Sequence, residues 1–463
     1  MSETLHIYLE ALQEHESVIT ADGVSIHTVA RKITVRTSDE VLRSSCFQLF
    51  NEHRSFKDVI DHAAQSSDAL TGLYSILQRC LQDNSLRIEY RIDDVPAGLF
   101  LPMGLMPLIA DVQPFSGVFH LSRFAMMHRS MGTLTLEAPV AAARFEIYDP
   151  TLTSQLSVWL SQESIKVEQS ILARILIIMG LAFPVDDSAL SAERRMTELN
   201  GWTIHEAYFQ FRSRYGYSTY PNGAYWFGAG QRPAPAASRI AIDCERRMSL
   251  PRPSTVRTSS LEDVIERRRS TREFEQLQPS IEDLSELFWR TMRQIEPLQL
   301  RVTAPDGSHH EFPLKRRPVP SGGSVHEVDV YLLVANDGAI PRGLWRYDDE
   351  QHELVFVSAL NDKTNVIQYR AMISAGLQAP PQMIILFAAR FDRMMWKYTA
   401  MSLGAIYKHV GVLYEIFYLV ATDIGLGICG LGSGDTAAFA DIIGSHPAIE
   451  SSVGEMIIGI PKR

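Results

Sequence analysis

Apolar residues in the C-terminal half of the chain recur at the spacing of amphipathic helices. Ser259 and Glu262 have the spacing of a capping box, and apolar residues follow them, which predicts a helix over 261–268. Another helix is expected after Ser280. A long helix is expected after Tyr398, because apolar residues recur there at steps of three and four, at Val410, Leu413, Phe417, Val420 and Ile424.

Short apolar runs between these helices predict the strands of the same half. A loop at 318–323 precedes the first of them. The expected strands are 328–334, 343–347, 354–357, 383–388 and 455–460. Together with the helices they indicate an α+β domain over residues 259–463.

The N-terminal half shows a different order of elements. A strand-rich stretch at 28–35 is followed by helical segments and then by an alternating, strand-like arm at 86–90. This is the pattern of a winged-helix module, which we place at 1–95. A second unit of similar order is expected at 96–200, with strands at 133–136 and 143–148 and helices at 156–160 and 171–181. The two share the order of elements rather than residues, so the sequence allows one such module or two.

Between the two halves the chain becomes rich in proline, glycine, alanine and aromatic residues. The clearest runs are Tyr220-Pro221-Asn222-Gly223 and Pro233-Ala234-Pro235-Ala236. Such a composition predicts a domain boundary or an arm that covers the following domain. We assign residues 201–258 to this connector.

Composition narrows the class of protein. The chain has 463 residues, 46 % of them apolar and 21 % charged, which is typical of a soluble globular protein. The formal net charge of −10 argues against a general nucleic-acid binder. Four cysteines without CxxC or metal-ligand spacing predict no metal site and fit a reducing cytoplasm. The N-terminus is no secretory signal, and the most apolar window, 171–185, is too short for a bilayer, so no membrane span is expected.

A cluster of cationic residues follows the helix at 261–268. Arg268 and Arg272 flank Ser270, so two guanidinium groups and one hydroxyl would lie close together whether the helix continues or ends in a turn. Such a set can collect charge-assisted hydrogen bonds to a phosphate. The alternative is that these arginines only complement the helix dipole.

Gly425, Gly427 and Gly430 form a literal GxGxxG pattern. A dinucleotide-binding fold needs these glycines after a strand and before a helix. Here they follow a helix, so we reject that interpretation. The glycines more simply end the helix and let the main chain pass close to a ligand.

Three segments in the same order resemble the nitroreductase-like flavoprotein family. They are the Arg268/Ser270/Arg272 cluster, the run from Arg317 to His326, and the glycine loop after the long helix. More narrowly, these segments and the pair Lys397-Tyr398 are similar to the SagB/ThcOx-type azoline dehydrogenases of ribosomal-peptide biosynthesis, in which such a pair opens the long helix. The run 204–214 is similar to the connector of that family.

This resemblance implies an FMN cofactor in a domain built on a central mixed or antiparallel sheet flanked by helices. It implies that the cofactor contacts Arg268, Ser270, Arg272, Arg317, Pro320, Ser321, Gly322, Gly323, Gly430, Gly432, Ser433, Lys462 and Arg463. Among these, Arg317 is expected at the carbonyl end of the flavin ring and the two C-terminal residues at the phosphate. Glu327 departs from the family, which usually has proline there, and Val325 stands where arginine is common. These departures concern the rim of the pocket and the substrate.

Oxidation of an azoline to an azole removes a Cα proton and a Cβ hydride, which the resemblance assigns to a base and to flavin N5. Lys397 and Tyr398 are the candidates for the catalytic pair, one as the base and the other as the group that orients the azoline nitrogen. A lysine has a pKa of about 10.4 in water and needs burial or neighbouring cations to act as a base. The alternative is a helix start with a solvent-directed lysine. His326 contacts the substrate or is structural.

The resemblance implies dehydrogenation of peptide thiazolines or oxazolines, with dioxygen reoxidising the flavin. The implied partners are a precursor peptide, a YcaO-type cyclodehydratase and a second copy of the chain, with 410–424 as the dimer helix or, alternatively, a core helix. Competing hypotheses are an NAD(P)H-dependent reductase of nitro or quinone compounds, an oxidase of another peptide bond, and an inactive peptide-binding scaffold. The expected location is the cytoplasm.

Overall fold

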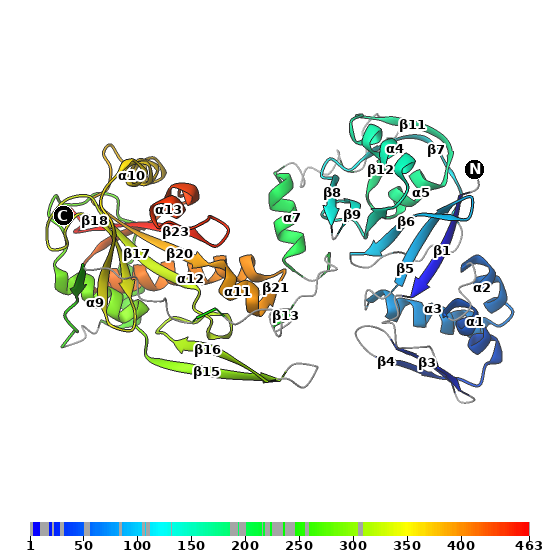
Figure 1. The fold of residues 1–463 in the computed structure, drawn as a ribbon, viewed down its shortest axis with the longest axis horizontal. Coiled ribbons are helices and arrows are strands. Elements are labelled where there is room, and N and C mark those ends of the chain that lie inside the picture. The colour runs from blue at the N-terminus through cyan, green and yellow to red at the C-terminus, as the bar shows by residue number, and fades with distance from the viewer. Residues whose placement is uncertain are drawn as a thin grey trace. The chain divides into compact units, whose positions relative to one another are not determined.

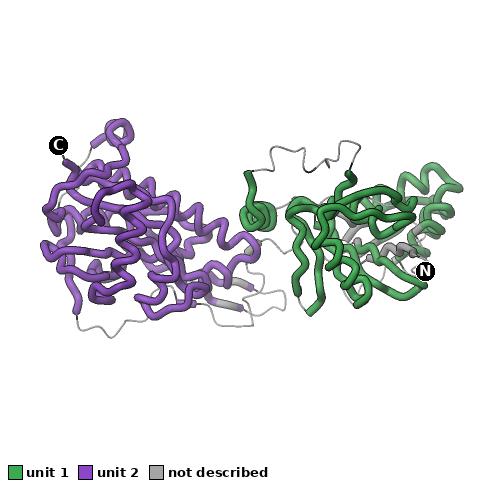
Figure 2. Tube along the Cα trace, turned by 90° about the horizontal axis from the view of Figure 1, so that it is seen from above, with its two compact units in different colours: residues 1–221 green, residues 222–463 purple. Residues whose placement is uncertain are grey.

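The protein was analysed as a computed structural model, which describes residues 3–9, 18–20, 23–27, 32–50, 56–82, 86–103, 107, 112–130, 132–185, 193, 201–214, 216–217, 223–224, 235–236, 246–254, 259–303 and 309–462. The chain forms two compact units, Met1–Pro221 and Asn222–Arg463 (Figure 2). Each unit has its own hydrophobic core. The connector expected at 201–258 is therefore divided, since its first part belongs to unit 1 and the rest to unit 2.

Unit 1 is built on an antiparallel sheet whose six described strands lie in the order β1-β5-β6-β10-β9-β8 (Figure 1). Their bounds are β1 Glu3–Leu9, β5 Leu86–Ile92, β6 Val95–Pro102, β8 Met126–Ser130, β9 Thr133–Glu137 and β10 Ala143–Ile147. Two smaller sheets join β2 Val18–Thr20, β3 Gly23–His27 and β4 Lys32–Arg36, and β11 Ile165–Ser170, β7 Phe115–Leu121 and β12 Ala182–Pro184. The helices are α1 Glu40–Phe50, α2 Phe56–Ala63, α3 Ser67–Gln82, α4 Pro150–Leu160, α5 Ile171–Ile178 and α7 Ile204–Arg212.

The boundary predicted between residues 95 and 96 is wrong. Strands β5 and β6 are the two arms of one hairpin, and residue 95 is the first residue of its second arm. The same sheet continues into β10, so one sheet spans both predicted modules. Phe145 of β10 stacks on Phe100 of β6 with ring centroids 4.2 Å apart, which joins the two parts in a single core. The winged-helix interpretation itself stays a prediction.

Helix α7, Ile204–Arg212, is anchored to unit 1. Tyr208 donates a hydrogen bond to the carbonyl of Glu137 at 2.8 Å, and Arg212 forms an ion pair with the Glu137 carboxylate at 3.0 Å. His128 binds the other oxygen of the same carboxylate at 2.8 Å. Because these partners lie on β8 and β9, helix α7 packs as part of unit 1 rather than crossing to the next domain.

Unit 2 contains a sheet of seven described strands in the order β14-β19-β18-β17-β20-β23-β22. Every pair in this sheet for which the structure gives a register is antiparallel. The bounds are β14 Arg247–Ser249, β17 Val328–Val334, β18 Gly343–Asp348, β19 Glu353–Ser358, β20 Met383–Arg390, β22 Gly427–Gly430 and β23 Glu450–Gly459. The strands expected at 328–334, 343–347, 354–357, 383–388 and 455–460 are thus confirmed. All residues of β17 are buried, because helices cover both faces of the sheet.

Helices α10 and α13 cover one face of this sheet, and α9 and α12 cover the other (Figure 1). The helices of unit 2 are α8 Leu261–Arg267, α9 Ile281–Met292, α10 Asp362–Ala375, α11 Phe391–Lys397, α12 Ser402–Ile424 and α13 Thr436–Ile442. A hairpin of β15 Glu296–Thr303 and β16 His309–Arg316 and a short pair of β13 Gly223–Ala224 and β21 Tyr398–Thr399 complete the unit. The sequence did not predict α10, α13 or the β15–β16 hairpin.

By length and composition, helix α12 could cross a membrane, and no other helix among the described residues meets this criterion. Core helices of soluble proteins meet the same criterion. Here Leu413, Phe417 and Ile424 of α12 are buried in the core under the sheet. The helix therefore belongs to the core of unit 2, whatever its exposed face contacts.

Candidate functional site

The loop between β16 and β17 brings the candidate site together. Gly322–Ser324 form one turn of 3₁₀ helix, and φ is positive at Gly323, Ser324 and His326. Gly323 has no room for a side chain, because a Cβ there would collide with Lys397 Nζ and lie 2.6 Å from the Tyr398 hydroxyl. The two catalytic candidates therefore converge on a glycine that lies 74 residues earlier in the chain.

The resemblance implied that Lys397 and Tyr398 open the long helix, but in the structure they do not. Lys397 is the last residue of α11, and Tyr398 has extended backbone and pairs with Ala224 in the short β13–β21 ladder. Helix α12 begins only at Ser402. Since the two residues are not helix neighbours, their side chains are free to point to the same place. The break between α11 and α12 is what lets them meet at Gly323.

Lys397 is held in a dry environment. Its side chain is 2 % exposed, and Nζ donates a hydrogen bond to the carbonyl of Gly323 at 2.8 Å. Burial, together with the charge of nearby Arg393, lowers the pKa of Lys397 to about 8. The structure therefore excludes the alternative of a lysine that extends into solvent. A lysine with this pKa is neutral in part of the molecules near neutral pH, which a base requires.

Arg393 lies near this lysine and binds the main chain around it. Its guanidinium is fully buried and donates hydrogen bonds to the carbonyls of Val325, Pro313, Pro235 and Ala236. Pro235 and Ala236 belong to the proline-rich run that the sequence predicted as a covering arm, and these two residues lie against unit 2 beside the site loop. The residues that flank them are outside the described part of the chain.

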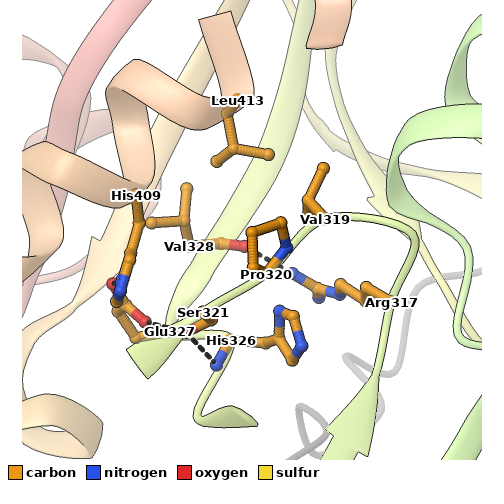
Figure 3. Close-up of a pocket in the computed structure, with 9 residues that line it drawn as sticks. All are labelled: Arg317, Val319, Pro320, Ser321, His326, Glu327, Val328, His409 and Leu413. Carbon is orange, nitrogen blue, oxygen red and sulfur yellow. Dashed lines mark hydrogen bonds and ion pairs between the residues drawn. The ribbon is translucent and has the colours of Figure 1, made fainter. Parts of the chain in front are cut away.

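A hydrogen-bonded chain that the sequence did not predict holds the same loop from the other side (Figure 3). The N–H of Gly322 donates to His409 Nε2 at 2.7 Å, and His409 Nδ1 lies 2.7 Å from Glu327 Oε1. Ser321 donates from its hydroxyl to Glu327 Oε2 at 3.3 Å. The departure from the family at position 327 therefore gives the loop a buried carboxylate. A histidine within the apolar pattern of the long helix was the sequence signal for the other partner.

Arg317 is held by acidic partners and a carbonyl at the base of the loop. Its guanidinium is buried and forms ion pairs with Asp349 at 2.9 Å and with Asp329 at 3.4 Å, and it donates to the Val328 carbonyl at 2.7 Å. These acceptors hold Arg317 at the base of the loop, and its contact with a cofactor stays a prediction.

His326 also faces the interior. It is 5 % exposed and lines a cavity of about 10 Å³, room for one water molecule, together with Arg317 and Glu327 (Figure 3). Burial, followed by the charges of Arg317 and Lys315, lowers the pKa of His326 to about 3. The structure thus favours the structural alternative for this histidine over contact with a substrate.

The cationic cluster lies where the chain turns out of α8 into an irregular segment, so the helix does not continue through it. The helix ends at Arg267, with Ser260 rather than Ser259 as its N-cap. Ser270 then bridges to Ile428 of β22. An open hollow of about 480 Å³ beside the turn is lined by Glu266, Arg267, Arg268, Arg269, Thr271, Thr422, Gly425, Leu426 and Pro461.

Tyr418 of α12 connects this turn to the glycine loop. Its hydroxyl lies 3.0 Å from Ser270 Oγ and accepts the N–H of Gly430 at 2.7 Å. The guanidinium of Arg268 lies 5.4 Å from the centre of the Tyr418 ring. Within the described residues no carboxylate is paired with Arg268 or Arg272. These cations therefore remain available for an anion, while Tyr418 fixes the turn.

The glycine loop follows the long helix, as predicted. Gly425 ends α12 with a φ of 85°, and β22 follows. Gly427 allows a close approach to the cationic turn, because a Cβ there would lie 2.7 Å from Thr271 Cγ2. Gly432 and Ser433 are exposed, but the N–H of Gly432 donates to Ser374 at 3.2 Å. This bond occupies the N–H group of Gly432, one of the two residues that the resemblance implied as neighbouring cofactor contacts.

The C-terminal tail runs beside the same turn. Lys462 donates its N–H to the carbonyl of Glu273 at 3.1 Å, and Pro461 bridges to Phe274. The side chain of Lys462 is exposed. Arg463, the other predicted phosphate contact from the tail, lies outside the described residues. Contacts of Pro320, Ser321 and Gly430 with a cofactor stay predictions.

Comparison with known proteins identifies two regions of the chain. Residues 265–460 match the model of the nitroreductase family. Residues 119–219 match the model of cyanobactin oxidase ThcOx. The chain therefore contains a nitroreductase domain and is similar to SagB/ThcOx-type proteins. Its nitroreductase domain lies in unit 2, and its ThcOx-like region lies within unit 1 and includes α7.

Curated relatives agree with this assignment. The chain is 25 % identical over 199 residues to "Putative nitroreductase MJ1384" of Methanocaldococcus jannaschii, a match that covers 42 % of this chain and 91 % of that protein. It is 23 % identical over 146 residues to the trifolitoxin-processing protein TfxB of Rhizobium leguminosarum bv. trifolii. That match covers 31 % of this chain and only 39 % of TfxB.

Solved structures give weaker likenesses. A putative nitroreductase from Ralstonia eutropha is 23 % identical and matches 52 % of this chain and 99 % of its own, with a TM-score of 0.37. A putative nitroreductase from Anabaena variabilis is 11 % identical and matches 99 % of this chain and 80 % of its own, with a TM-score of 0.40. With TM-scores below 0.5, these likenesses add nothing to the family matches.

Nitroreductases are flavin oxidoreductases, so the domain type implies an oxidoreductase with a flavin cofactor. The residues of unit 2 fit such a group at its anionic end. A hollow lined by consecutive arginines, with Arg268 held over Tyr418, matches the charge of a phosphate. At the other end, Gly322 and Gly323 present main chain without side chains beside a buried lysine.

Proposed function

We propose that this protein is an FMN-dependent azoline dehydrogenase that oxidises thiazoline or oxazoline rings in a ribosomally made peptide. The observation that carries the proposal is Lys397, a buried lysine with a lowered pKa that meets Tyr398 at the Gly322–Gly323 loop of a nitroreductase domain. Reduction of a small nitro compound by NAD(P)H needs no such base. The ThcOx-like region in unit 1 supports a peptide substrate.

Each part of the site has a task in this proposal. Arg268, Ser270 and Arg272 would hold the cofactor phosphate, and the Ser321–Gly323 loop would face the flavin ring. Bound FMN would supply the two-electron acceptor for the hydride that leaves Cβ. Neutral Lys397 would take the Cα proton, and the Tyr398 hydroxyl would orient the azoline nitrogen. Burial and, after it, the charge of Arg393 keep the pKa of Lys397 low, and Arg393 also anchors the arm at Pro235 and Ala236.

The proposal extends to partners. TfxB is named for the processing of trifolitoxin, and ThcOx is named as a cyanobactin oxidase. By analogy, this chain would act on a precursor peptide after a YcaO-type cyclodehydratase has formed the rings, in the cytoplasm. We also expect a homodimer, with the exposed face of α12 around Tyr407 and Val412 at the interface. Sedimentation velocity of the full chain would measure that state directly.

Mass spectrometry of a defined substrate tests the function. The flavin-loaded protein is mixed with a synthetic peptide that contains one thiazoline and one oxazoline, under air. We expect a loss of two hydrogens per ring and uptake of one dioxygen for each ring oxidised. A Lys397→Met variant with normal flavin content is the matched control and should leave the peptide unchanged.

Two results would contradict the proposal. In the first, the peptide mass stays constant with wild-type protein that carries flavin. In the second, NADPH bleaches the bound flavin rapidly in a stopped-flow experiment and Lys397→Met bleaches equally fast, which would favour the reductase. A purified protein that stays colourless after addition of FMN would favour the inactive scaffold.

A further inference from the structure

We infer that Glu327 and His409 are positioning residues, which together set the main chain of Ser321–Gly323 so that the Gly323 carbonyl meets Lys397. This inference rests on the proposed function, since it names what prepares the proposed base. Nothing in the family motif predicts the pair, because position 327 is usually proline in the family and His409 lies in the middle of α12.

Each of the two carboxylate oxygens of Glu327 is hydrogen-bonded to a different side chain that contacts the loop. Oε2 accepts the hydroxyl of Ser321 at 3.3 Å, and Oε1 lies 2.7 Å from His409 Nδ1. Glu327 is fully buried, so these bonds replace the water that a carboxylate otherwise needs. A carboxylate in such a place carries a large cost if its partners are removed, which makes the arrangement rigid.

The direction of the hydrogen bonds fixes the state of His409. A backbone N–H can only donate, so His409 Nε2 accepts the proton of Gly322 at 2.7 Å and carries none itself. The ring proton is then on Nδ1, from which it is donated to Glu327. The carboxylate therefore selects the tautomer that offers a lone pair to the loop, as acidic partners of histidines commonly do.

The loop needs such support because its backbone is strained. Positive φ values occur at Gly323 (59°), Ser324 (55°) and His326 (46°), and residues other than glycine adopt this region at a cost of about 1 kcal/mol or more. Ser321 also accepts the N–H of His326 at 3.0 Å, so the hydroxyl bound to Glu327 ties both ends of the turn. Loss of the pair would remove the hydrogen bonds of Gly322 to His409 and of Ser321 to Glu327.

The consequence reaches Lys397 through a single residue. Gly322 binds His409 through its N–H, and the next residue, Gly323, binds Lys397 Nζ through its carbonyl at 2.8 Å. A change in the orientation of Gly322 therefore turns the peptide that the lysine contacts. A Cβ at Gly322 would lie 3.2 Å from His409 Nε2, so a side chain there would have to displace the imidazole ring by a few tenths of an ångström.

The test compares two substitutions of one residue in the full-length protein. His409→Gln keeps an acceptor near the place of Nε2, while His409→Leu removes it at similar volume. Lys408→Leu, at an exposed position of the same helix, is the matched control. Amide hydrogen exchange of Gly322, measured with fragmentation in flavin-free protein, reports on the loop without any catalysis. Steady-state kinetics on the azoline peptide report on kcat and KM separately.

We expect Gly322 to exchange about tenfold faster in His409→Leu, as for the loss of one buried hydrogen bond, and to recover at least half of its protection in His409→Gln. kcat should fall about tenfold in His409→Leu with KM and flavin content unchanged, and it should recover in His409→Gln in parallel with Gly322 protection. Gly322 protection and kcat of Glu327→Gln should lie between those of His409→Leu and His409→Gln, because the glutamine amide oxygen can still accept a hydrogen bond from His409 Nδ1.

Unchanged Gly322 exchange in His409→Leu would overturn the inference, and so would a loss of kcat in His409→Gln as large as in His409→Leu. If His409→Leu does not fold, Ser321→Ala, which removes the second route from Glu327, is measured in the same way, and unchanged exchange at Gly322 would then overturn the inference. If wild-type protein oxidises no azoline but Gly322 still responds, the proposed function fails and the positioning role stands.

Discussion

Lys397 shows how one residue acquires a chemical property from its surroundings. Its ammonium group is shielded from water, and its near neighbours are the Gly323 carbonyl and the cation of Arg393. Burial contributes most to the lowered pKa, and like charge adds to it. His326 is shifted in the same sense by burial and by Arg317. In both residues the neutral form is therefore easier to reach than in water, with different consequences for activity and for stability.

Activity should depend on pH through Lys397. The base is active when it is neutral, so kcat/KM should rise about tenfold per pH unit below pH 8 and level off above it. Lys397→Met should lose roughly 100-fold or more of the rate. The pH–rate profile of wild type and of Tyr398→Phe measures this. A profile that stays flat from pH 6 to 9 would assign the proton transfer to another group.

Acid stability should depend on His326. Its pKa is about 3 in the folded protein and near 6.5 in the unfolded chain, so between these values only the unfolded state takes up the proton. The free energy of unfolding therefore decreases as the pH falls from 6.5 toward 3. In His326→Asn the unfolding free energy should depend less steeply on pH, by roughly 1.4 kcal/mol per pH unit, which corresponds to one proton. Asparagine suits this position because it tolerates the positive φ and does not titrate. Urea titrations between pH 4 and 7 measure the slope, and equal slopes would contradict the prediction.

At the scale of the element, the sequence predicted helices and strands correctly where one face of the element is apolar. Strand β17 and helices α8, α9 and α12 lie where the apolar spacing predicted them. Helix α10 was missed because its apolar residues point both ways: Ile367 and Ala371 are buried, whereas Tyr369 and Ile373 are exposed. Without one apolar stripe, the helical period is invisible in the sequence.

The packing of β22 against the cationic turn makes a second element-level prediction. Gly427→Ala places a Cβ against Thr271 and should cost about 1–3 kcal/mol of unfolding free energy, because backbone and neighbour must separate. Gly432→Ala meets no atom within 4 Å and should change stability by less than about 0.5 kcal/mol. Fluorescence titration should also show weaker FMN binding by Gly427→Ala. Equal stability of the two variants would mean that β22 can move away without cost.

At the scale of the whole molecule, the two units carry separate cores. The core of unit 1 runs from Val24 to Ala182, and the cores of unit 2 lie between Leu250 and Ile458. The residues proposed to bind the cofactor all belong to unit 2. Damage to one core should therefore affect flavin binding only if it is the core of unit 2.

A matched pair of core substitutions tests this independence. Phe145→Ala in unit 1 and Phe387→Ala in unit 2 each remove a fully buried ring, at a cost of about 3–5 kcal/mol. We expect Phe145→Ala to keep its bound FMN at temperatures where Phe387→Ala releases it. Flavin fluorescence recorded during thermal unfolding measures the release. Equal release temperatures in the two variants would show that the units unfold together.

The sequence by itself determined the elements with a one-sided apolar pattern, the cationic cluster, the helix-before-glycine order and the family resemblance, because these depend on residues close together in the chain. Tertiary structure decided that Lys397 and Tyr398 meet at Gly323, that Arg317 is bound to Asp329 and Asp349, and that one sheet spans both N-terminal modules. Glu327 and His409 are 82 residues apart and touch only in the folded chain. Burial and hydrogen-bond partners arise from such long-range contacts, so no local pattern contains them.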